Sequence, residues 1–569
     1  MKLLVFLPPI LSGLLLWTAF FPLDLGPVGF FALAPLLTLV RAEGVGAWRR
    51  FAAGYCGGLA FFIPALQWIR VADPAMYAAW IGLSLICALY WPIGIALLRR
   101  LDRLHKPLLC LTTPVVWVAL EYFRAHFPTG FPFLKWIHCH QYVGFGWYFL
   151  GYTQHAFNLF IQAADVGGVY LISAAVASAN GAAAEWLLRL PVVRRICNLP
   201  PRPPEVGFAR EFIATAVAGF AVAAPFCYGL IRTQHPPFAA GPRVAAIQAD
   251  VGQDAKMTNL DGLFERYNRL CLGVAARADL VVWPETCYPF EWWTIGPEPA
   301  AQAENPVLRN GPVSRAWVKY FATGEAVGIR KPDVEFAGPW KTNVLLGLNG
   351  YEWNGKRVVP SNTAILVDRD GDAQGRYDKM HLVPFGEYVP FRETFPWLQK
   401  FTPYKHDYSC RPGETFTRFP LAVGDRQYTF GVLICYEDSD PQLARRYAEP
   451  VGDEKPVDFL VNISNDGWFK GTEEHEGHLA ICQFRAVEAR RSVIRAVNMG
   501  ISAVIDPDGK VVDLPAGTWA TSKKMDGYVI QKVPIDTRGS YYADFGDWLP
   551  GTCWGLIAIG WIASRRKRS

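Results

Sequence analysis

The distribution of charge along the chain constrains its fold more than any other feature. Residues 1–240 hold 26 Asp, Glu, Lys and Arg residues, about 11%, whereas residues 241–569 hold 80, about 24%. A stretch this long and this poor in charge does not form an ordinary water-facing domain, and the mean hydropathy of the whole chain is positive, at +0.13. We therefore expect two domains in different solvents, the first of them in lipid.

Eight segments approach the roughly 20 apolar residues that a helix needs to cross the hydrocarbon core of a bilayer. They are residues 3–23, 26–40, 51–69, 77–98, 108–123, 166–188, 212–231 and 548–564. A ninth segment, 142–161, is rich in aromatic residues but is interrupted by glycines and polar residues, and hydropathy alone does not decide whether it spans.

Basic residues indicate the orientation, because cytoplasmic loops collect Lys and Arg. The clusters are Arg41, Arg49 and Arg50; Arg99, Arg100, Arg103 and Lys106; Arg189, Arg194, Arg195, Arg202 and Arg210; and the tail 565–568. If segment 142–161 does not span, all four clusters fall on the cytoplasmic side, so we interpret it as interfacial or re-entrant. Lys2 before the first apolar run indicates an uncleaved first helix.

With all four basic clusters on the cytoplasmic side, the chain is predicted to have three parts. Residues 1–231 form seven transmembrane helices, residues 232–547 form an extracytoplasmic domain, and residues 548–569 form an eighth helix with a basic cytoplasmic tail. The net charge of +6 comes from the membrane part and the tail, so we expect no nucleic-acid partner.

The large domain alternates short β-branched runs with helical segments, a pattern typical of a layered α/β fold. Strands are predicted at 244–248, 280–283, 343–348, 363–367, 431–434, 459–463, 493–497 and 502–505, and helices at 263–276 and 478–490. Segments 304–340 and 138–147 are interpreted as additions without an assigned role.

Polar side chains follow three of these apolar runs. Glu285 ends the first, Lys379 and Glu387 flank a short apolar stretch, and Cys435 ends another run shortly before Glu437. Taken singly, each has an ordinary interpretation: a solvated or capping carboxylate, a surface lysine, or an inert buried thiol. Together they supply the thiol, the base and the cation that acyl transfer through cysteine needs.

Four motifs resemble the nitrilase (carbon-nitrogen hydrolase) superfamily: Trp283-Pro-Glu285, Gly375-Arg-Tyr-Asp-Lys379-Met-His-Leu-Val-Pro-Phe-Gly-Glu387, Ile434-Cys435-Tyr436-Glu437 and Asn465-Asp-Gly-Trp-Phe469. The long second motif, with Arg485-Ala-Val-Glu488 and Asn498-Met-Gly-Ile-Ser502, is similar to the bacterial apolipoprotein N-acyltransferase family in particular. The similarity covers residues 243–540 and agrees with the predicted topology, since that family has eight spans.

The resemblance implies an α+β membrane protein, in which an eight-helix bundle carries a nitrilase-like αββα sandwich on the periplasmic side of the bacterial inner membrane. It implies a Glu-Lys-Cys triad at Glu285, Lys379 and Cys435 and a ping-pong reaction with no metal and no nucleotide. A phospholipid gives an acyl chain to the cysteine, and the thioester passes it to the α-amino group of the N-terminal diacylglyceryl-cysteine of an apolipoprotein.

The resemblance also gives secondary positions. Glu387, Tyr436 and Glu437 match positions beside the nucleophile or on a loop that closes over it. Met257 stands where the family commonly has tryptophan, so the lining of the acyl-chain pocket differs there.

Two other functions stay open from the sequence alone. A membrane-tethered nitrilase-type amidase would hydrolyse its thioester with water and release free fatty acid. A transporter or receptor with an inactive outer domain would carry intramembrane charges along a path, and the predicted spans are nearly free of charge.

Overall fold

A computed structural model describes residues 3–127, 144–201, 207–295, 314–315, 318–323, 339–354, 356–392, 394–401, 408–452 and 455–566. The chain divides into two compact units, a helical unit (1–130, 144–235 and 540–569) and a β-rich unit (131–143 and 236–539). Most of the segment 304–340 and residues 138–143 lie outside the described residues.

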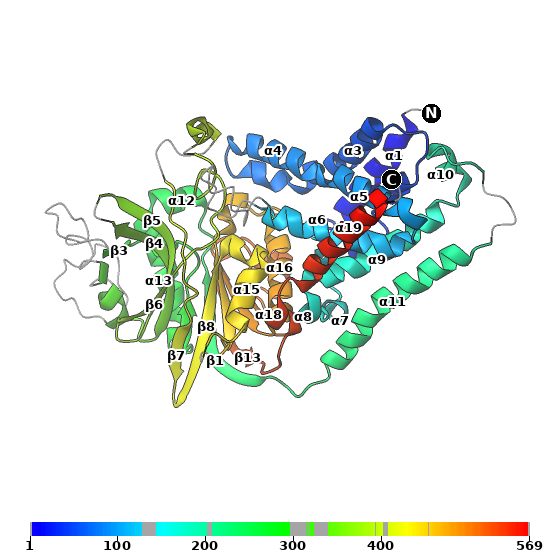
Figure 1. The fold of residues 1–569 in the computed structure, drawn as a ribbon. Helices are drawn as coiled ribbons and strands as arrows, with labels where there is room; N and C mark the ends of the chain where they lie inside the picture. Colours follow the sequence, from blue (N-terminus) through cyan, green and yellow to red (C-terminus); the bar gives the residue numbers. More distant parts are fainter. Residues whose placement is uncertain are drawn as a thin grey trace. The chain divides into compact units, whose positions relative to one another are not determined.

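The helical unit contains helical structure in all eight segments expected to span a membrane (Figure 1). Its longer helices are α1 (Leu7–Thr18), α3 (Ala47–Ala65), α4 (Met76–Ala88), α5 (Tyr90–His105), α6 (Leu109–His126), α9 (Val169–Leu187), α11 (Ala209–Arg232) and α19 (Trp548–Arg566). Its shorter helices are α2 (Ala34–Leu37), α7 (Asn158–Ile161), α8 (Ala164–Gly167), α10 (Pro191–Ile196) and α18 (Tyr541–Phe545).

Length and apolarity qualify fewer of these helices as membrane spans. Among the described residues, two helices are long and apolar enough to cross a bilayer, Met76–His105, which joins α4 and α5, and α11. A third candidate is the pair Asn158–Gly167 and Val169–Leu187, which meet at 118°; Gly168 lies at the bend with a φ of +65°, which glycine adopts without strain. The eight-helix transmembrane bundle is therefore not confirmed.

Apolar side chains on the outside of the helical unit suit a lipid environment. On α11, Phe212, Phe220 and Ile231 are 62%, 76% and 72% exposed, and Ile559 on α19 is 66% exposed. A water-soluble helix normally presents charged or polar residues on such a face. These helices thus have the surface of a membrane-embedded protein.

The β-rich unit holds two sheets. Its strands are β1 (Ala239–Gln248), β2 (Leu280–Val282), β3 (Trp292–Ile295), β4 (Asn343–Trp353), β5 (Val358–Val367), β6 (Ala373–Asp378), β7 (Phe419–Val423), β8 (Arg426–Ile434), β9 (Phe459–Ser464), β10 (Ser492–Val497), β11 (Ala503–Ile505), β12 (Val511–Asp513) and β13 (Gly527–Ile535). One sheet has seven strands in the order β13-β1-β2-β4-β5-β6, with β3 paired to β4, and the other has the order β12-β11-β10-β9-β8-β7. All eight predicted strands are present.

Successive side chains of a strand point to opposite faces of its sheet, so each sheet packs against a different layer on either side. On β1, Val244 and Ala246 belong to the core shared with β8 and β9 of the second sheet, whereas Ala245 and Ile247 pack with helix α13 (Leu260–Ala275) on the opposite face. Helices α15 (Pro441–Ala448) and α16 (Glu474–Ala489) contact β8 and β10 of the second sheet (Figure 1). Two sheets between two helical layers form the predicted αββα sandwich.

Candidate active site

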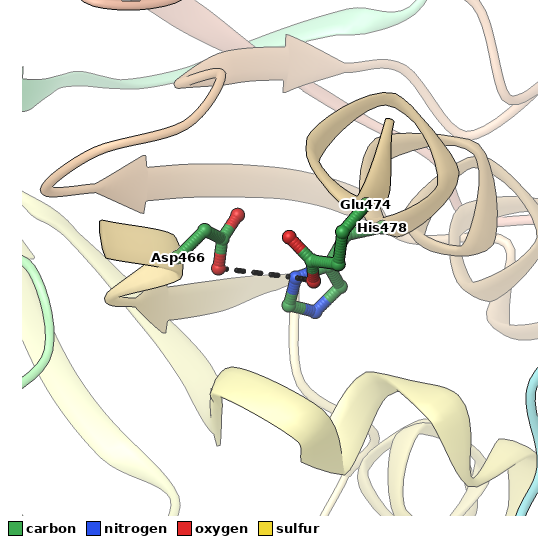
Figure 2. A group of neighbouring side chains, drawn as sticks. All are labelled: Asp466, Glu474 and His478. Carbon is green, nitrogen blue, oxygen red and sulfur yellow. Dashed lines mark hydrogen bonds and ion pairs between the residues drawn. The ribbon is translucent and has the colours of Figure 1, made fainter. Parts of the chain in front are cut away.

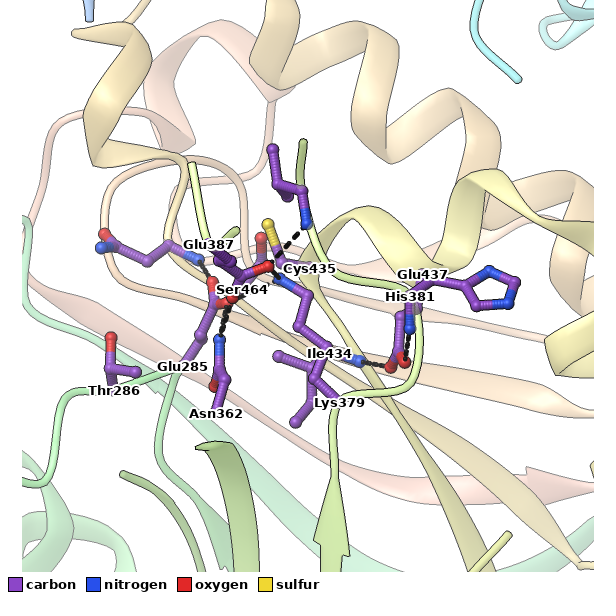
Figure 3. A network of polar contacts seen from close by, with 12 residues as sticks. Glu285, Thr286, Asn362, Lys379, His381, Glu387, Ile434, Cys435, Glu437 and Ser464 are labelled. Carbon is purple, nitrogen blue, oxygen red and sulfur yellow. Dashed lines mark hydrogen bonds and ion pairs between the residues drawn. The ribbon is translucent and has the colours of Figure 1, made fainter. Parts of the chain in front are cut away.

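The three predicted triad residues each follow a strand, and the strands come from both sheets. Glu285 lies just beyond β2, Lys379 directly follows β6, and Cys435 directly follows β8. Figure 3 shows the three side chains gathered at one place, with Lys379 Nζ 3.1 Å from Glu285 Oε1. The structure thus brings together residues that lie up to 150 positions apart in the sequence.

Glu285 is buried and is held by donors on both of its oxygens. Oε1 accepts a hydrogen bond from Asn362 Nδ2 at 2.6 Å besides that from Lys379 Nζ, and Oε2 accepts one from the backbone N–H of Asn465 at 3.0 Å. Fixed in this way, the carboxylate cannot swing toward solvent. It keeps a defined position from which it can accept a further proton.

Lys379 lies between two carboxylates with its side chain only 1% exposed. Nζ is 2.9 Å from Glu387 Oε2 in addition to its contact with Glu285. Burial opposes the charge on this ammonium, but Glu285 and Glu387 outweigh that effect and hold the pKa of Lys379 well above its ordinary value. The site therefore contains a permanent cation, which suits the stabilisation of an oxyanion.

Cys435 begins the one-turn helix η8 (Cys435–Ser439) with a φ of +54°. Non-glycine residues rarely adopt this left-handed conformation, and where they do, the strain commonly serves a functional site. Burial raises the pKa of the Cys435 thiol to about 12; Glu285 raises it further, and Lys379 opposes the increase. At neutral pH the resting thiol keeps its proton, so nucleophilic attack requires a base.

Glu437 connects the cysteine turn to the lysine loop. This fully buried carboxylate accepts hydrogen bonds from the backbone N–H groups of Ile434 at 2.6 Å, Met380 at 2.6 Å and His381 at 3.1 Å. It also accepts from the Tyr377 hydroxyl at 2.9 Å. Ile434 precedes the nucleophile and Met380 follows Lys379. The Glu437 side chain therefore fixes both the segment that carries Cys435 and the segment that carries Lys379 (Figure 3).

The other secondary residues lie in different surroundings. Glu387 is half-buried, and besides Lys379 it contacts Asn362 Nδ2 at 2.7 Å and the Val383 N–H at 2.8 Å. Tyr436 is half-buried next to the nucleophile. Met257 belongs to helix α12 (Gln253–Thr258), but its side chain lies outside the described residues.

Sequence reasoning did not find two further residues of the site, Asn362 and Lys256. Asn362, on β5, donates one hydrogen to each of Glu285 and Glu387. Lys256 is buried and donates to the backbone oxygen of Glu285 at 3.0 Å and to Thr286 Oγ1 at 2.6 Å. An amide on an apolar strand and a lysine one residue before Met257 were the only signals, and neither indicates a partner.

One buried group offers the side chains of a metal site. Asp466, Glu474 and His478 bring ligand atoms within 4.8 Å of one another (Figure 2). Protein donors already engage Asp466, since Ser464 Oγ lies 2.6 Å from Oδ1 and Arg495 Nη2 lies 2.8 Å from Oδ2. Two cationic or hydroxyl donors on one carboxylate fit a hydrogen-bonded cluster better than a coordination shell.

The chain is similar to known proteins along most of its length. Residues 12–182 match the family described as the apolipoprotein N-acyltransferase N-terminal domain, and residues 243–541 match the carbon-nitrogen hydrolase family. The apolipoprotein N-acyltransferase of Geobacter metallireducens is 29% identical over 99% of this chain and 96% of its own. That of Azotobacter vinelandii is 30% identical over 88% and 85%. Among solved structures, an amidase from Nesterenkonia sp. is 17% identical over 57% of this chain and all of its own, with a TM-score of 0.34.

Proposed function

The chain belongs to the apolipoprotein N-acyltransferases, membrane enzymes that acylate lipoproteins, and on this premise we propose how its residues carry out the transfer. The observation that carries the proposal is the half-buried thiol of Cys435, placed after β8 in the same site as the ion-paired Glu285 and Lys379.

The first half-reaction loads the enzyme. Glu285 takes the proton from Cys435 as the sulfur attacks the ester carbonyl of a phospholipid, and the Lys379 ammonium stabilises the tetrahedral oxyanion. The ester C–O bond then breaks, Glu285 returns the proton to the departing glycerol oxygen, and a lysophospholipid leaves. The acyl chain remains on Cys435 as a thioester.

The second half-reaction consumes the thioester. The α-amino group of the diacylglyceryl-cysteine of an apolipoprotein attacks the thioester carbonyl, and Glu285 accepts the proton that the amine loses. The C–S bond breaks, an amide forms, and the sulfur takes a proton back from Glu285. One carboxylate thus serves as base and acid in turn, while the Lys379 charge stays constant.

The attachment of the catalytic domain to a membrane unit supports lipid substrates for both steps. Exposing an acyl chain to water costs about 0.8 kcal/mol per methylene, so a catalytic domain attached to a membrane unit avoids a large penalty. We further propose that all eight apolar segments cross the inner membrane and that residues 232–547 lie on its periplasmic side.

The competing reaction is hydrolysis of the same thioester by water, as in an amidase. The comparisons with apolipoprotein N-acyltransferases over nearly the whole chain do not favour it. An acyltransferase requires a pocket that keeps water from the thioester until a lipid-bound amine enters.

Mass spectrometry of the purified enzyme after incubation with phospholipid and no acceptor tests the proposal. We expect the protein to become heavier by one acyl chain, held as a hydroxylamine-sensitive thioester on the peptide that contains Cys435. Adding a diacylglyceryl-peptide should move the chain to the peptide amine.

Matched variants identify the nucleophile. Cys435→Ala should abolish labelling, and Cys287→Ala, Cys410→Ala and Cys482→Ala should keep it. A label on one of these other cysteines would contradict the assignment, and rapid loss of the label as free fatty acid would favour the hydrolase.

A further inference from the structure

A cluster of five charged or titratable side chains is buried beside the cysteine turn and has no part in the proposed proton transfers. Its members are Asp438 in η8, Asp466 in the short helix η9 (Asp466–Phe469), Glu474 and His478 on α16, and Arg495 on β10. Each is at most 2% exposed. Charges buried this deeply are costly unless they are paired, so their arrangement needs a physical account.

The imidazole of His478 has a carboxylate at each ring nitrogen. Nε2 lies 2.9 Å from Asp438 Oδ1, and Nδ1 lies 3.2 Å from Asp466 Oδ1 (Figure 2 draws this contact). Nδ1 also lies 3.3 Å from Oε1 of Glu474, one turn earlier on the same helix. A neutral imidazole has one N–H, and its other nitrogen would direct a lone pair at a carboxylate. The imidazolium form donates to both. Burial and Arg495 oppose this charge, but Asp438 and Asp466 hold the pKa of His478 well above its ordinary value.

Charge balance supports the same protonation state. Arg495 lies 3.4 Å from Asp438 Oδ2 and 2.8 Å from Asp466 Oδ2, so two cations face two carboxylates. Glu474 Oε2 has no hydrogen-bond partner among the described residues, and burial raises the pKa of Glu474 to about 7. With Glu474 protonated the cluster is neutral, as a fully buried group should be.

Two of the carboxylates that His478 contacts, Asp438 and Asp466, are joined to the active site by the chain itself. Asp438 lies in the same turn as Cys435, and Arg485 Nη1 donates to its backbone oxygen at 2.8 Å. Asp466 follows Asn465, whose backbone N–H donates to Glu285 Oε2. His478 therefore connects the segment that carries the nucleophile to the segment that holds the base.

We propose that His478 is a positioning residue, whose imidazolium holds the Cys435 turn and the Asn465 loop at the separation that lets Glu285 reach the thiol. The proposal rests on the roles of Cys435 and Glu285 given above. His478 itself touches no substrate. It acts through Asp438 and Asp466, in the way that outer partners orient the ligands of a metal site.

The variant His478→Gln in the full-length enzyme tests the proposal. The amide keeps one donor but turns an oxygen toward the second carboxylate, so the two segments should move apart. We expect the rate of acyl-enzyme formation to fall by about 10- to 100-fold, the loss typical of a misplaced catalytic pair. The phospholipid KM should stay the same, because His478 does not touch the lipid. Rates are expressed per folded enzyme, counted by the fraction of protein that elutes as a single species in size-exclusion chromatography.

His475→Gln is the matched control. His475 is equally buried on the same helix, but among the described residues its Nε2 contacts only the backbone oxygen of Asp466, at 3.1 Å. Burial lowers the pKa of His475 to about 4, so it is neutral. This variant should keep acyl-enzyme formation within about threefold of wild type. Similar losses in both variants would indicate a general packing effect and would overturn the proposal.

The double variant Asp438→Asn/His478→Gln separates positioning from any other role of His478. An asparagine at 438 can donate to the new amide oxygen, so the bridge and the neutral charge are restored, and we expect a recovery of at least tenfold over His478→Gln. If His478→Gln does not accumulate, the double variant is compared with Asp438→Asn. Similar rates support the bridge, and a further hundredfold loss contradicts it.

Two results would refute the assignment directly. One is wild-type kcat in His478→Gln. The other is a stoichiometric divalent cation in the purified enzyme that is lost in His478→Gln, because a metal ligand must be a neutral imidazole. Failure of the proposed function has a different signature, since wild-type enzyme would then form no thioester with phospholipid. In that case the rate of Cys435 alkylation can still be measured in each variant and used to compare how the thiol is positioned.

Discussion

The proposed role of Lys379 depends on the shape of its ammonium group as well as on its charge. Its ammonium fits between Glu285 and Glu387 with almost no exposure, and an oxyanion would need a third position around the same nitrogen. A compact ammonium with three rotatable donors can serve all three, whereas a planar guanidinium cannot.

Lys379→Arg should therefore fail to support acylation although it keeps the charge. We expect acyl-enzyme formation to fall by about 10²- to 10³-fold, the usual cost of losing an oxyanion donor. The measurement is the initial rate of thioester formation by mass spectrometry. Turnover near the wild-type rate in this variant would argue against a positioned ammonium.

The Cys435 thiol gives a prediction about pH. Because its pKa is raised to about 12 from an ordinary value near 8.5, the proton stays on the sulfur at every pH below that value. The rate at which iodoacetamide alkylates Cys435 in substrate-free enzyme should rise steadily between about pH 7 and about pH 10. The rate for a cysteine peptide levels off near the ordinary thiol pKa. A plateau near pH 9 in the enzyme would show that the resting thiol is not perturbed.

Sequence reasoning reached the residues that end apolar strands but not those that act from within a strand. Glu285 and Cys435 were visible because a polar group after a buried run is unusual. Asn362 was not, since an amide on β5 has no spacing that points to Glu285, 77 positions away. The cluster around His478 was hidden for the same reason, because its partners come from four separate elements.

At the scale of elements, Glu437 makes the end of β8 and the loop after β6 a single rigid piece. Glu437→Gln replaces one acceptor oxygen by an NH₂ group that faces backbone N–H donors, so at least one buried donor loses its partner. The expected cost is about 1–3 kcal/mol of unfolding free energy, together with slower acylation of Cys435.

Chemical denaturation of the detergent-purified enzyme, followed by a probe in the β-rich unit, measures this cost. Asp526→Asn is a suitable comparison, because it makes the same change in a carboxylate that is 44% exposed and paired with Arg266. Exposed pairs contribute little, so this variant should behave as wild type. Equal destabilisation by the two substitutions would mean that Glu437 has no special connecting role.

The strands that sequence patterns predicted are the central ones, and those they missed are mostly peripheral. β9 and β10 are buried along their whole length and appear as continuous apolar runs. β6, β12 and β13 have exposed positions and mixed composition, and β3 and β7 lie at the sides of their sheets. Their pairing depends on neighbours far away in the sequence, which a local pattern does not contain.

At the scale of the whole molecule, the prediction of eight spans came from the lengths of apolar segments and the positions of basic clusters, and the structure adds the shapes of the helices. Segment 26–40 consists of a 3₁₀ helix, the four-residue α2 and a second 3₁₀ turn, which is why it does not qualify by length. Hydropathy averages over such breaks. A measurement in the membrane counts the crossings directly.

Reporter fusions provide that measurement. A reporter fused after Asp440 should be active only outside the cytoplasm, and one fused after Ser569 only inside it, because that arrangement places every basic cluster in the cytoplasm. The opposite result at either position would overturn the eight-span topology without affecting the chemistry at Cys435.

The pairing of β1 with β13 has a consequence for how such a protein can be assembled. Ala239, where β1 begins, lies opposite Ile535, where β13 ends. The two ends of the segment 236–539 thus lie side by side, although almost 300 residues separate Ala239 from Ile535. A domain whose ends are adjacent can be inserted into a loop of another protein, or replaced by another domain, without separating the two points of attachment.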